Sequence, residues 1–337
     1  MDNQRTPRSY STGSVKRDNR QQQQKMVVIM ICIVIALLLV VFMTIIGTKI
    51  VVALMGGHQN ADPSAVQYKD VPLDKSQSLY GPLALINDTH VYVFPDDADK
   101  NLTNISGYRM AHSDPNNFPY KISTNNLELD GAALHALHEM LSDFNKETKQ
   151  GNVIIAFAYR SKEDNNYLTP TGYSDLHTGC SVTLKIYDGK ITTDIETDPT
   201  YYGWLTENAY KYGFVQRYPE GKEAVTGTSD YLEMFRYVGY GPAMYMKQNN
   251  LCLDEFLAQI KAHTHGNPLK VTDANDQDWL IYYTPCEGEM ATVKLPTNFT
   301  YTVSGDNDGG IIVCVSLSKT AYEQQQQQQE SESESAQ

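Results

Sequence analysis

The chain has 337 residues, of which 41% are hydrophobic and 20% charged, and its 27 basic and 40 acidic side chains give a formal net charge of −13. This hydrophobic content is enough for the core of one large or two modest domains, so the composition excludes an intrinsically disordered chain. The acidic balance disfavours a nucleic-acid-binding protein, because contacts with phosphates need a basic face.

The N-terminal region divides into a basic tail and an apolar run. Residues 1–25 hold six basic and two acidic side chains, a net charge of +4, and no charged residue occurs from Met26 to Gly47. At about 1.5 Å per helical residue, this run spans a hydrocarbon core of roughly 30 Å. Because basic flanks stay on the cytoplasmic side, residues 1–25 are predicted to be a cytoplasmic tail and residues 26–47 a transmembrane signal-anchor helix. The rest of the chain is then extracellular, attached to the cell membrane by a single span.

The segments on either side of the predicted external domains have little apolar content. A cleaved signal peptide is the alternative to an anchor, but Thr48 and Lys49 follow the apolar run where a cleavage site between small residues is needed. Residues 57–70 lack apolar periodicity, and residues 48–70 are predicted to form a stalk. Residues 321–337 consist mainly of Gln, Glu and Ser and are predicted to be a disordered tail.

Between these segments the apolar pattern alternates between strands and helices. Short apolar runs bounded by turn residues predict strands, and apolar residues at three- and four-residue steps predict helices. In chain order we expect strands over 83–87 and 91–95, a helix over 131–149, strands over 153–159 and 181–187, and helices over 202–212 and 250–262. Further short strands are expected over 279–283, 291–295, 299–303 and 310–317. Residues 266–320 are therefore predicted to be a separate, small all-β module.

Four cysteines lie in the predicted external part, at Cys180, Cys252, Cys286 and Cys314. They allow three full disulfide pairings, and the sequence does not choose among them. No two cysteines have the C-x-x-C spacing, which argues against a thiolate zinc cluster or a redox pair. The common nucleotide-binding, zinc-protease and nucleophile-elbow signatures are also missing from the chain.

Several segments, in order, resemble the VanY-type D-alanyl-D-alanine carboxypeptidases. They are YRS at 159–161, GYSDLHTG at 172–179, YGWLTENAYKYGF at 202–214, RYPEGK at 217–222, RYVG at 236–239 and NNLCL at 249–253. The resemblance covers residues 120–262 and implies an α+β domain over about residues 71–265, with helices packed on an antiparallel sheet and a zinc peptidase site in a cleft.

The resemblance also implies which residues would hold the zinc ion. The family takes ligands from S-x-H-x-x-G-x-A-x-D and from the His of E-x-W-H, whose Glu is the general base. Aligned on Ser174 and Gly179, the first two ligand positions hold Leu176 and Thr183. Aligned on RYVG, the third ligand position holds Met234 and the base position holds Tyr231. Because zinc catalysis needs three N, O or S donors and an open water position, we predict no catalytic residue, no metal site and no cofactor.

The residues that would hold a peptide in such a cleft are retained. The resemblance places Arg160 and Ser174 in the substrate cleft, and a guanidinium binds a carboxylate in a two-pronged fork without any metal. An intradomain salt bridge of Arg160 is the alternative. Arg217 and Arg236 also match family positions and are predicted to be architectural, as is His177, which follows the ligand position.

Two functions follow from this pattern. The first is a membrane-anchored, extracytoplasmic and catalytically degenerate relative of the carboxypeptidases, which binds cell-wall stem peptides or a protein of the cell envelope without hydrolysis. The alternative is an active zinc-dependent D,D-carboxypeptidase that acts on peptidoglycan peptides with a non-standard ligand set. For the histidines at positions 135 and 138, one helical turn apart, partly buried structural roles are favoured over a two-histidine metal grip.

Overall fold

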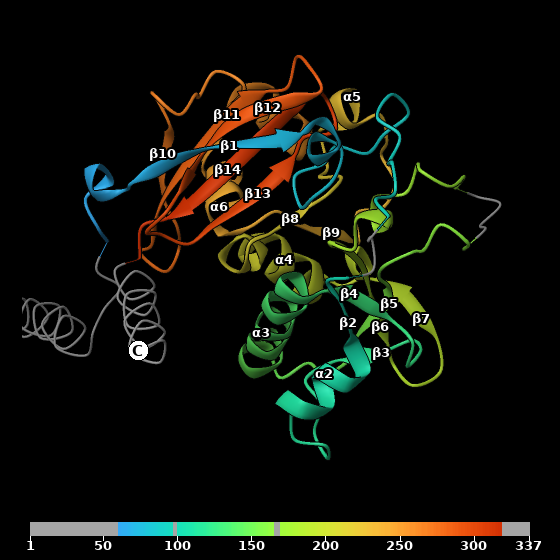
Figure 1. Cartoon of the computed structure of the whole chain (residues 1–337). Coiled ribbons are helices and arrows are strands. Elements are labelled where there is room, and N and C mark those ends of the chain that lie inside the picture. The colour runs from blue at the N-terminus through green and yellow to red at the C-terminus, as the bar shows by residue number, and fades with distance from the viewer. Residues whose placement is uncertain (1–59, 97–99, 165–168, 319–337) are drawn as a thin grey trace, which may run out of the picture. The chain divides into compact units, whose positions relative to one another are not determined.

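A computed structural model of the chain describes residues 60–96, 100–164 and 169–318 (Figure 1). The predicted cytoplasmic tail, transmembrane helix and C-terminal tail, at residues 1–25, 26–47 and 321–337, lie outside these residues. In the described part, none of the helices is both long enough and apolar enough to cross a membrane.

A central sheet carries most of the segments that the resemblance covers. Its order is β3-β5-β6-β9-β8, and a further strand, β7, pairs with β6. All pairs are antiparallel, as expected, except the short β3–β5 pair, which is parallel. The strands are β3 (Lys121–Ile122), β5 (Val153–Phe157), β6 (Ser181–Tyr187), β7 (Thr192–Asp194), β8 (Phe214–Gln216) and β9 (Met234–Tyr237). The predicted strands over 153–159 and 181–187 are thus β5 and β6.

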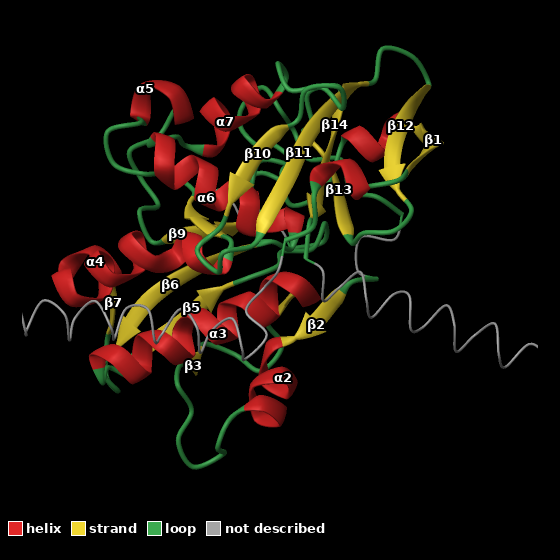
Figure 2. Ribbon diagram, turned by 90° about the vertical axis from the view of Figure 1, so that its left-hand side faces the viewer, coloured by secondary structure: helices red, strands yellow, loops and turns green. Residues whose placement is uncertain are grey.

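Two helices cover this sheet and enclose the first core. They are α3 (Gly131–Thr148) and α4 (Pro199–Asn208), the latter continued by the 3-10 turn η5 (Ala209–Tyr212). The carboxylate of Asp130 caps α3 by accepting hydrogen bonds from the backbone N–H groups of Ala132 and Ala133. The apolar stripe of α3 packs on Val153, Ile155 and Leu184 of the sheet. A small ladder of β2 (Leu102–Asn104) with β4 (Glu128–Asp130) and the helix α2 (Ile105–His112) lie beside them (Figure 2).

A second sheet, in the order β10-β11-β14-β13, forms the β module. Its strands are β10 (Leu269–Thr272), β11 (Asp278–Pro285), β13 (Tyr301–Gly305) and β14 (Gly310–Ser316). Alternate side chains of β14 enter two different cores, so that Ile311 and Val313 face one and Ile312 and Cys314 the other. This is why β14 reads as a continuous apolar run.

Each face of the second sheet is covered by other elements. On one face lies an antiparallel pair of β1 (Tyr68–Asp74) and β12 (Met290–Pro296) (Figure 1). On the other lie α6 (Tyr240–Asn249) and α7 (Leu253–Ile260), with Phe256 and Ile260 fully buried against the strands. The predicted helix over 250–262 is therefore α7, shortened at both ends.

The structure corrects two predicted boundaries. The predicted stalk does not extend to residue 70, because Asn60 bridges Ser318 and β1 begins at Tyr68, paired along its whole length with β12. The β module is not separate from the preceding domain, because α6 and α7 share a core with β10, β11 and β14. The described residues accordingly all belong to one compact unit.

The predicted strands over 83–87 and 91–95 are loops. Their backbone groups bond elsewhere: the carbonyls of Pro82, Ala84 and Ile86 accept hydrogen bonds from the guanidinium groups of Arg236 and Arg217. The carbonyls of the first segment thus bond arginine side chains where those of a strand would bond a neighbouring strand. The remaining short elements are η1 (Pro63–Ala65), η2 (Lys75–Ser78), η3 (Asp175–Thr178), η4 (Ile195–Thr197) and α5 (Glu223–Thr226).

The cysteines Cys180, Cys252, Cys286 and Cys314 are all free and buried. Burial raises the pKa of the Cys180 thiol to about 12, which keeps the group protonated at neutral pH. In the structure these side chains therefore act as small apolar core residues.

Candidate functional site

One pocket is lined both by residues that match the family motifs and by residues that replace the expected zinc ligands and base. This pocket has a volume of about 870 Å³ and lies against β6, β9 and η3. Its lining includes every residue that the resemblance places in the active site: Arg160, Ser174, Leu176, Thr183, Tyr231 and Met234. The sequence motifs identified each of these positions separately. The structure shows that they line the same pocket.

The three positions where the resemblance expects zinc ligands are close neighbours. Thr183 of β6 pairs directly with Met234 of β9, and Leu176 lies in η3 on the same pocket wall. Leucine has no donor atom, threonine is a weak neutral donor, and a methionine thioether suits soft metals such as copper(I) better than zinc. These side chains do not fit a zinc ion. Within residues 60–96, 100–164 and 169–318, no three His, Cys, Asp or Glu side chains are grouped so that they could hold a metal.

Arg160 is held by neutral backbone groups. Its Nε and Nη2 donate to the carbonyl of Asp164 at 3.0 and 2.9 Å, and Nη2 also donates to the carbonyl of Thr169 at 2.9 Å. The backbone of Arg160 is held by η3: its N–H donates to the carbonyl of Leu176, and its carbonyl accepts a hydrogen bond from the ring of His177. The predicted alternative of an intradomain salt bridge is not seen with any described carboxylate. The guanidinium at the pocket wall, 9% exposed, therefore keeps its positive charge for a ligand.

Ser174 supplies a second polar group beside Arg160. It precedes η3 as its N-cap, and its hydroxyl oxygen accepts a hydrogen bond from the backbone N–H of Leu176 at 3.3 Å. The hydroxyl proton is not used in this bond, so the group can still donate to a ligand.

Two charged pocket residues were not singled out from the sequence as a pair. The ammonium of Lys185 lies 3.6 Å from the carboxylate of Glu233, and it also bonds the carboxylate of Asp194. The side chain of Glu233 is only 13% exposed. The pairing follows from β6 and β9 lying side by side, which no local sequence pattern reveals.

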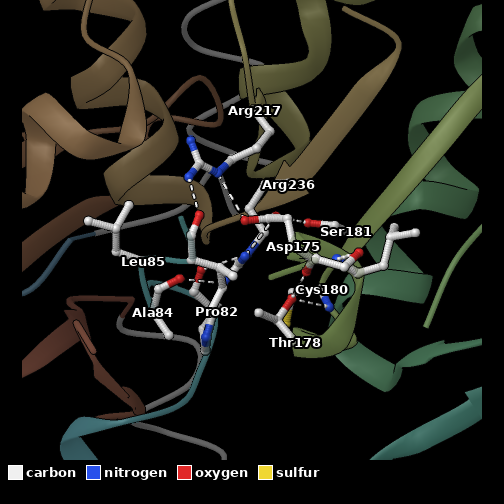
Figure 3. A network of polar contacts seen from close by, with 12 residues as sticks. Pro82, Ala84, Leu85, Asp175, Thr178, Cys180, Ser181, Arg217 and Arg236 are labelled. Carbon is white, nitrogen blue, oxygen red and sulfur yellow. Dashed lines mark hydrogen bonds and ion pairs between the residues drawn. The ribbon is translucent and has the colours of Figure 1, made fainter. Parts of the chain in front are cut away.

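Behind the pocket lies a buried ion network centred on Asp175 (Figure 3). One carboxylate oxygen accepts a hydrogen bond from Nε of Arg217 at 2.9 Å, and the other accepts one from Nη1 of Arg236 at 2.8 Å and one from the hydroxyl of Ser181. Arg217 also pairs with Asp254 at 2.9 Å. Both arginines are fully buried, which confirms the prediction that they are architectural.

The charge state of Asp175 results from two opposed effects. Burial alone would raise the pKa of this carboxyl, but Arg236, Arg217 and the Ser181 hydroxyl outweigh it and lower the pKa to about 2. Asp175 is therefore ionised at neutral pH. Its ion pairs with Arg217 and Arg236 hold η3 against these two buried arginines.

His177 is a structural residue, as predicted. Its ring is buried between the rings of Tyr92 and Phe94, with centroid distances of 6.3 and 4.8 Å, and its Nδ1 donates to the carbonyl of Arg160 at 2.8 Å. Burial lowers the pKa of His177, so the ring is neutral. The histidines at 135 and 138 bond tyrosine hydroxyls, and His138 is partly buried as expected, but the side chain of His135 is 60% exposed.

Comparison with known proteins finds similarity to one family over part of the chain. Residues 95–240 match the VanY family of D-alanyl-D-alanine carboxypeptidases. A D-alanyl-D-alanine carboxypeptidase of Enterococcus faecium is 29% identical over 252 residues, which cover 72% of this chain and 78% of the relative. One of Enterococcus faecalis (strain ATCC 700802 / V583) is 35% identical over 100 residues, covering 30% of this chain and 35% of the relative.

A solved structure extends the similarity to most of the described fold. The crystal structure of the vancomycin resistance D,D-dipeptidase VanXYg, in complex with a D-Ala-D-Ala phosphinate analog, aligns with a TM-score of 0.61 at 26% identity. The alignment covers 74% of this chain and 99% of the dipeptidase. The likeness therefore includes segments outside residues 95–240.

Proposed function

Because the chain carries a domain of the VanY D-alanyl-D-alanine carboxypeptidase family, we propose that it binds the carboxylate end of cell-wall stem peptides in the 870 Å³ pocket without hydrolysing them. One observation carries the proposal. The cationic Arg160 is retained and held by neutral carbonyls at the wall of a pocket in which Leu176, Thr183 and Met234 replace the expected metal donors.

The chemistry of the pocket suits binding rather than cleavage. Within the described part of the chain, Nε and Nη2 of Arg160 already donate to backbone carbonyls, so the positive charge and the N–H groups of Nη1 remain for a carboxylate. A partly dry pocket strengthens such a charge-assisted hydrogen bond relative to water. Ser174 can add a further hydrogen bond beside it. Without a metal-bound water, the lining residues supply no activated nucleophile for an amide bond. The complex with a D-Ala-D-Ala phosphinate analog in VanXYg supports a peptide end as the ligand class.

The predicted location is part of the same proposal. With residues 26–47 in the membrane and residues 1–25 in the cytoplasm, the pocket would face the cell wall, where stem peptides occur. A cell-envelope protein with a free carboxyl terminus is the alternative partner, since it presents the same chemical group.

Truncation of Arg160 tests the proposal. We expect Arg160→Ala to weaken binding of a stem pentapeptide about tenfold or more, because a hydrogen bond to a charged group contributes about 1.5–3 kcal/mol. The measurement is isothermal titration calorimetry on the full chain in detergent, with thermal unfolding to check that the variant folds. Arg160→Lys keeps the charge but loses the fixed placement of the guanidinium N–H groups, and is expected to show an intermediate loss.

A parallel assay separates the two functions derived from the sequence. D-Alanine release and metal content are measured on the same wild-type sample. Release of D-alanine together with about one zinc per chain would establish the active-enzyme alternative and end the present proposal. Equal affinity of wild type and Arg160→Ala would remove Arg160 from the ligand site.

A further inference from the structure

Exposed apolar side chains gather at the mouth of the same pocket. In the described part of the chain, Phe157, Tyr173, Val225 and Tyr231 are 56%, 40%, 47% and 48% exposed, and all four line the pocket. They come from four separate segments, so no local pattern forces this grouping. Exposed apolar side chains that cluster at a concave site are typical of ligand recognition.

The pocket wall is apolar where a zinc site would be polar. Leu176 and Met234 occupy positions where the family resemblance expects ionised or metal-bound side chains, and Pro170 lies in the same lining. An apolar wall next to a guanidinium matches a ligand that presents a carboxylate and an apolar side chain close together.

The size of the pocket points the same way. Its 870 Å³ lie near the upper end of the range of about 300–1,000 Å³ that small-ligand pockets occupy. A terminal alanine, whose side chain is one methyl group, leaves most of this apolar surface in contact with water. A terminal residue with a long or branched side chain covers far more of it.

Tyr231 adds an independent observation from the backbone. Its φ is +68°, in the left-handed region that residues other than glycine seldom adopt. The ring is half exposed and only tilts toward Tyr218, with centroids 6.0 Å apart, so core packing does not account for the strained backbone. Such strain concentrates at ligand-binding sites.

From these observations we propose that the pocket selects stem-type peptides whose terminal residue carries a bulky apolar side chain, such as leucine, methionine or phenylalanine, over peptides that end in alanine. The inference rests on the proposed function, because it assigns the terminal carboxylate to Arg160. The terminal side chain then packs among Leu176, Met234 and the exposed ring of Tyr231.

The test compares stem pentapeptides that differ only in the last residue. Calorimetric titration of the full chain in detergent is done with peptides that end in D-alanine, D-leucine, D-phenylalanine and L-leucine. We expect the D-leucine and D-phenylalanine peptides to bind at least about tenfold more tightly than the D-alanine peptide, because each buried methylene group contributes about 0.8 kcal/mol.

Variants of the exposed apolar residues at the pocket mouth, here called the rim, test whether these residues cause the preference for a bulky terminal residue. Tyr231→Gly removes the ring and relaxes a backbone that glycine adopts freely, so the protein should fold at least as well as wild type. We expect it to weaken binding of the D-leucine peptide about fivefold and that of the D-alanine peptide much less, so that the preference for the D-leucine peptide decreases. Phe157→Ser is the second rim variant, and Ile191→Ser, 61% exposed and outside the lining, is the matched control with no expected effect.

The outcomes distinguish this inference from the function on which it rests. Tighter Arg160-dependent binding of the D-alanine peptide would overturn the bulky-residue preference and leave the proposed function intact. Tighter binding of the L-leucine peptide would point to a protein carboxyl terminus and overturn the assignment to stem peptides. Failure of every peptide to bind would end both proposals.

Discussion

The triple variant Leu176→His, Thr183→Asp and Met234→His is expected to bind about one zinc ion per chain, whereas the wild-type protein is expected to retain none. The three positions line one pocket, and Thr183 and Met234 face each other across the β6–β9 pair. Two histidines and a carboxylate are a ligand set that zinc accepts, with a fourth position left for water. Metal analysis of the full chain after dialysis measures the gain.

Controls make this gain specific. Each single variant supplies one new ligand and is expected to bind no stoichiometric zinc, since a catalytic site needs three protein ligands. Adding Tyr231→Glu introduces a carboxylate at the base position and is expected to produce detectable release of D-alanine from a stem pentapeptide. A triple variant that keeps its thermal stability but binds no zinc would show that the three side chains do not converge.

Asp175→Asn is expected to lower the free energy of unfolding by about 3–5 kcal/mol. The change removes the carboxylate that the fully buried Arg217 and Arg236 share, and an uncompensated buried charge costs about that much. Urea denaturation of the full chain in detergent measures it. Asp70→Asn breaks an exposed pair with Lys294 and is the matched control, with an expected change below about 1 kcal/mol.

The same residue imposes a pH dependence on stability. The pKa of Asp175 is about 2 in the folded protein and near 3.8 when unperturbed, so the unfolded chain takes up the proton first as the pH falls. The contribution to stability, about 2 kcal/mol, is therefore complete above about pH 5 and is lost as the pH approaches 2. Asp175→Asn is expected to lack this acid-dependent loss. If the variant lost the same stability as wild type between pH 5 and pH 2, the proposed role of the ion network would be contradicted.

The retained arginines show how function and architecture separate in this fold. Arg217 and Arg236 use their charge on Asp175 and on loop carbonyls, whereas Arg160 bonds only neutral carbonyls among its described partners. The resemblance predicted this division, with Arg160 in the cleft and the other two architectural, but it left open an intradomain salt bridge of Arg160. The contacts of Arg160 show hydrogen bonds to carbonyl groups and no ion pair with a described carboxylate.

The spacing of apolar residues along the chain predicted the longer helices and strands correctly. The three- and four-residue apolar steps of 131–149 predicted α3, and the apolar run at 181–187 coincides with β6. In both elements the side chains that are buried recur at the spacing of the helix or strand, so the sequence pattern identifies them. The strands predicted at 83–87 failed for a tertiary reason: buried arginines distant in sequence use their carbonyl groups.

Residue identity at motif positions such as Leu176, Thr183 and Met234 was enough to indicate the family resemblance and to predict that the expected donor side chains are replaced. The tertiary structure alone decided that β1 pairs with β12 and that Phe157 and Tyr231 share one rim with Arg160. The physical reason is that such contacts join residues far apart in the chain. Their free energy comes from mutual burial, and no short-range spacing of side chains records it.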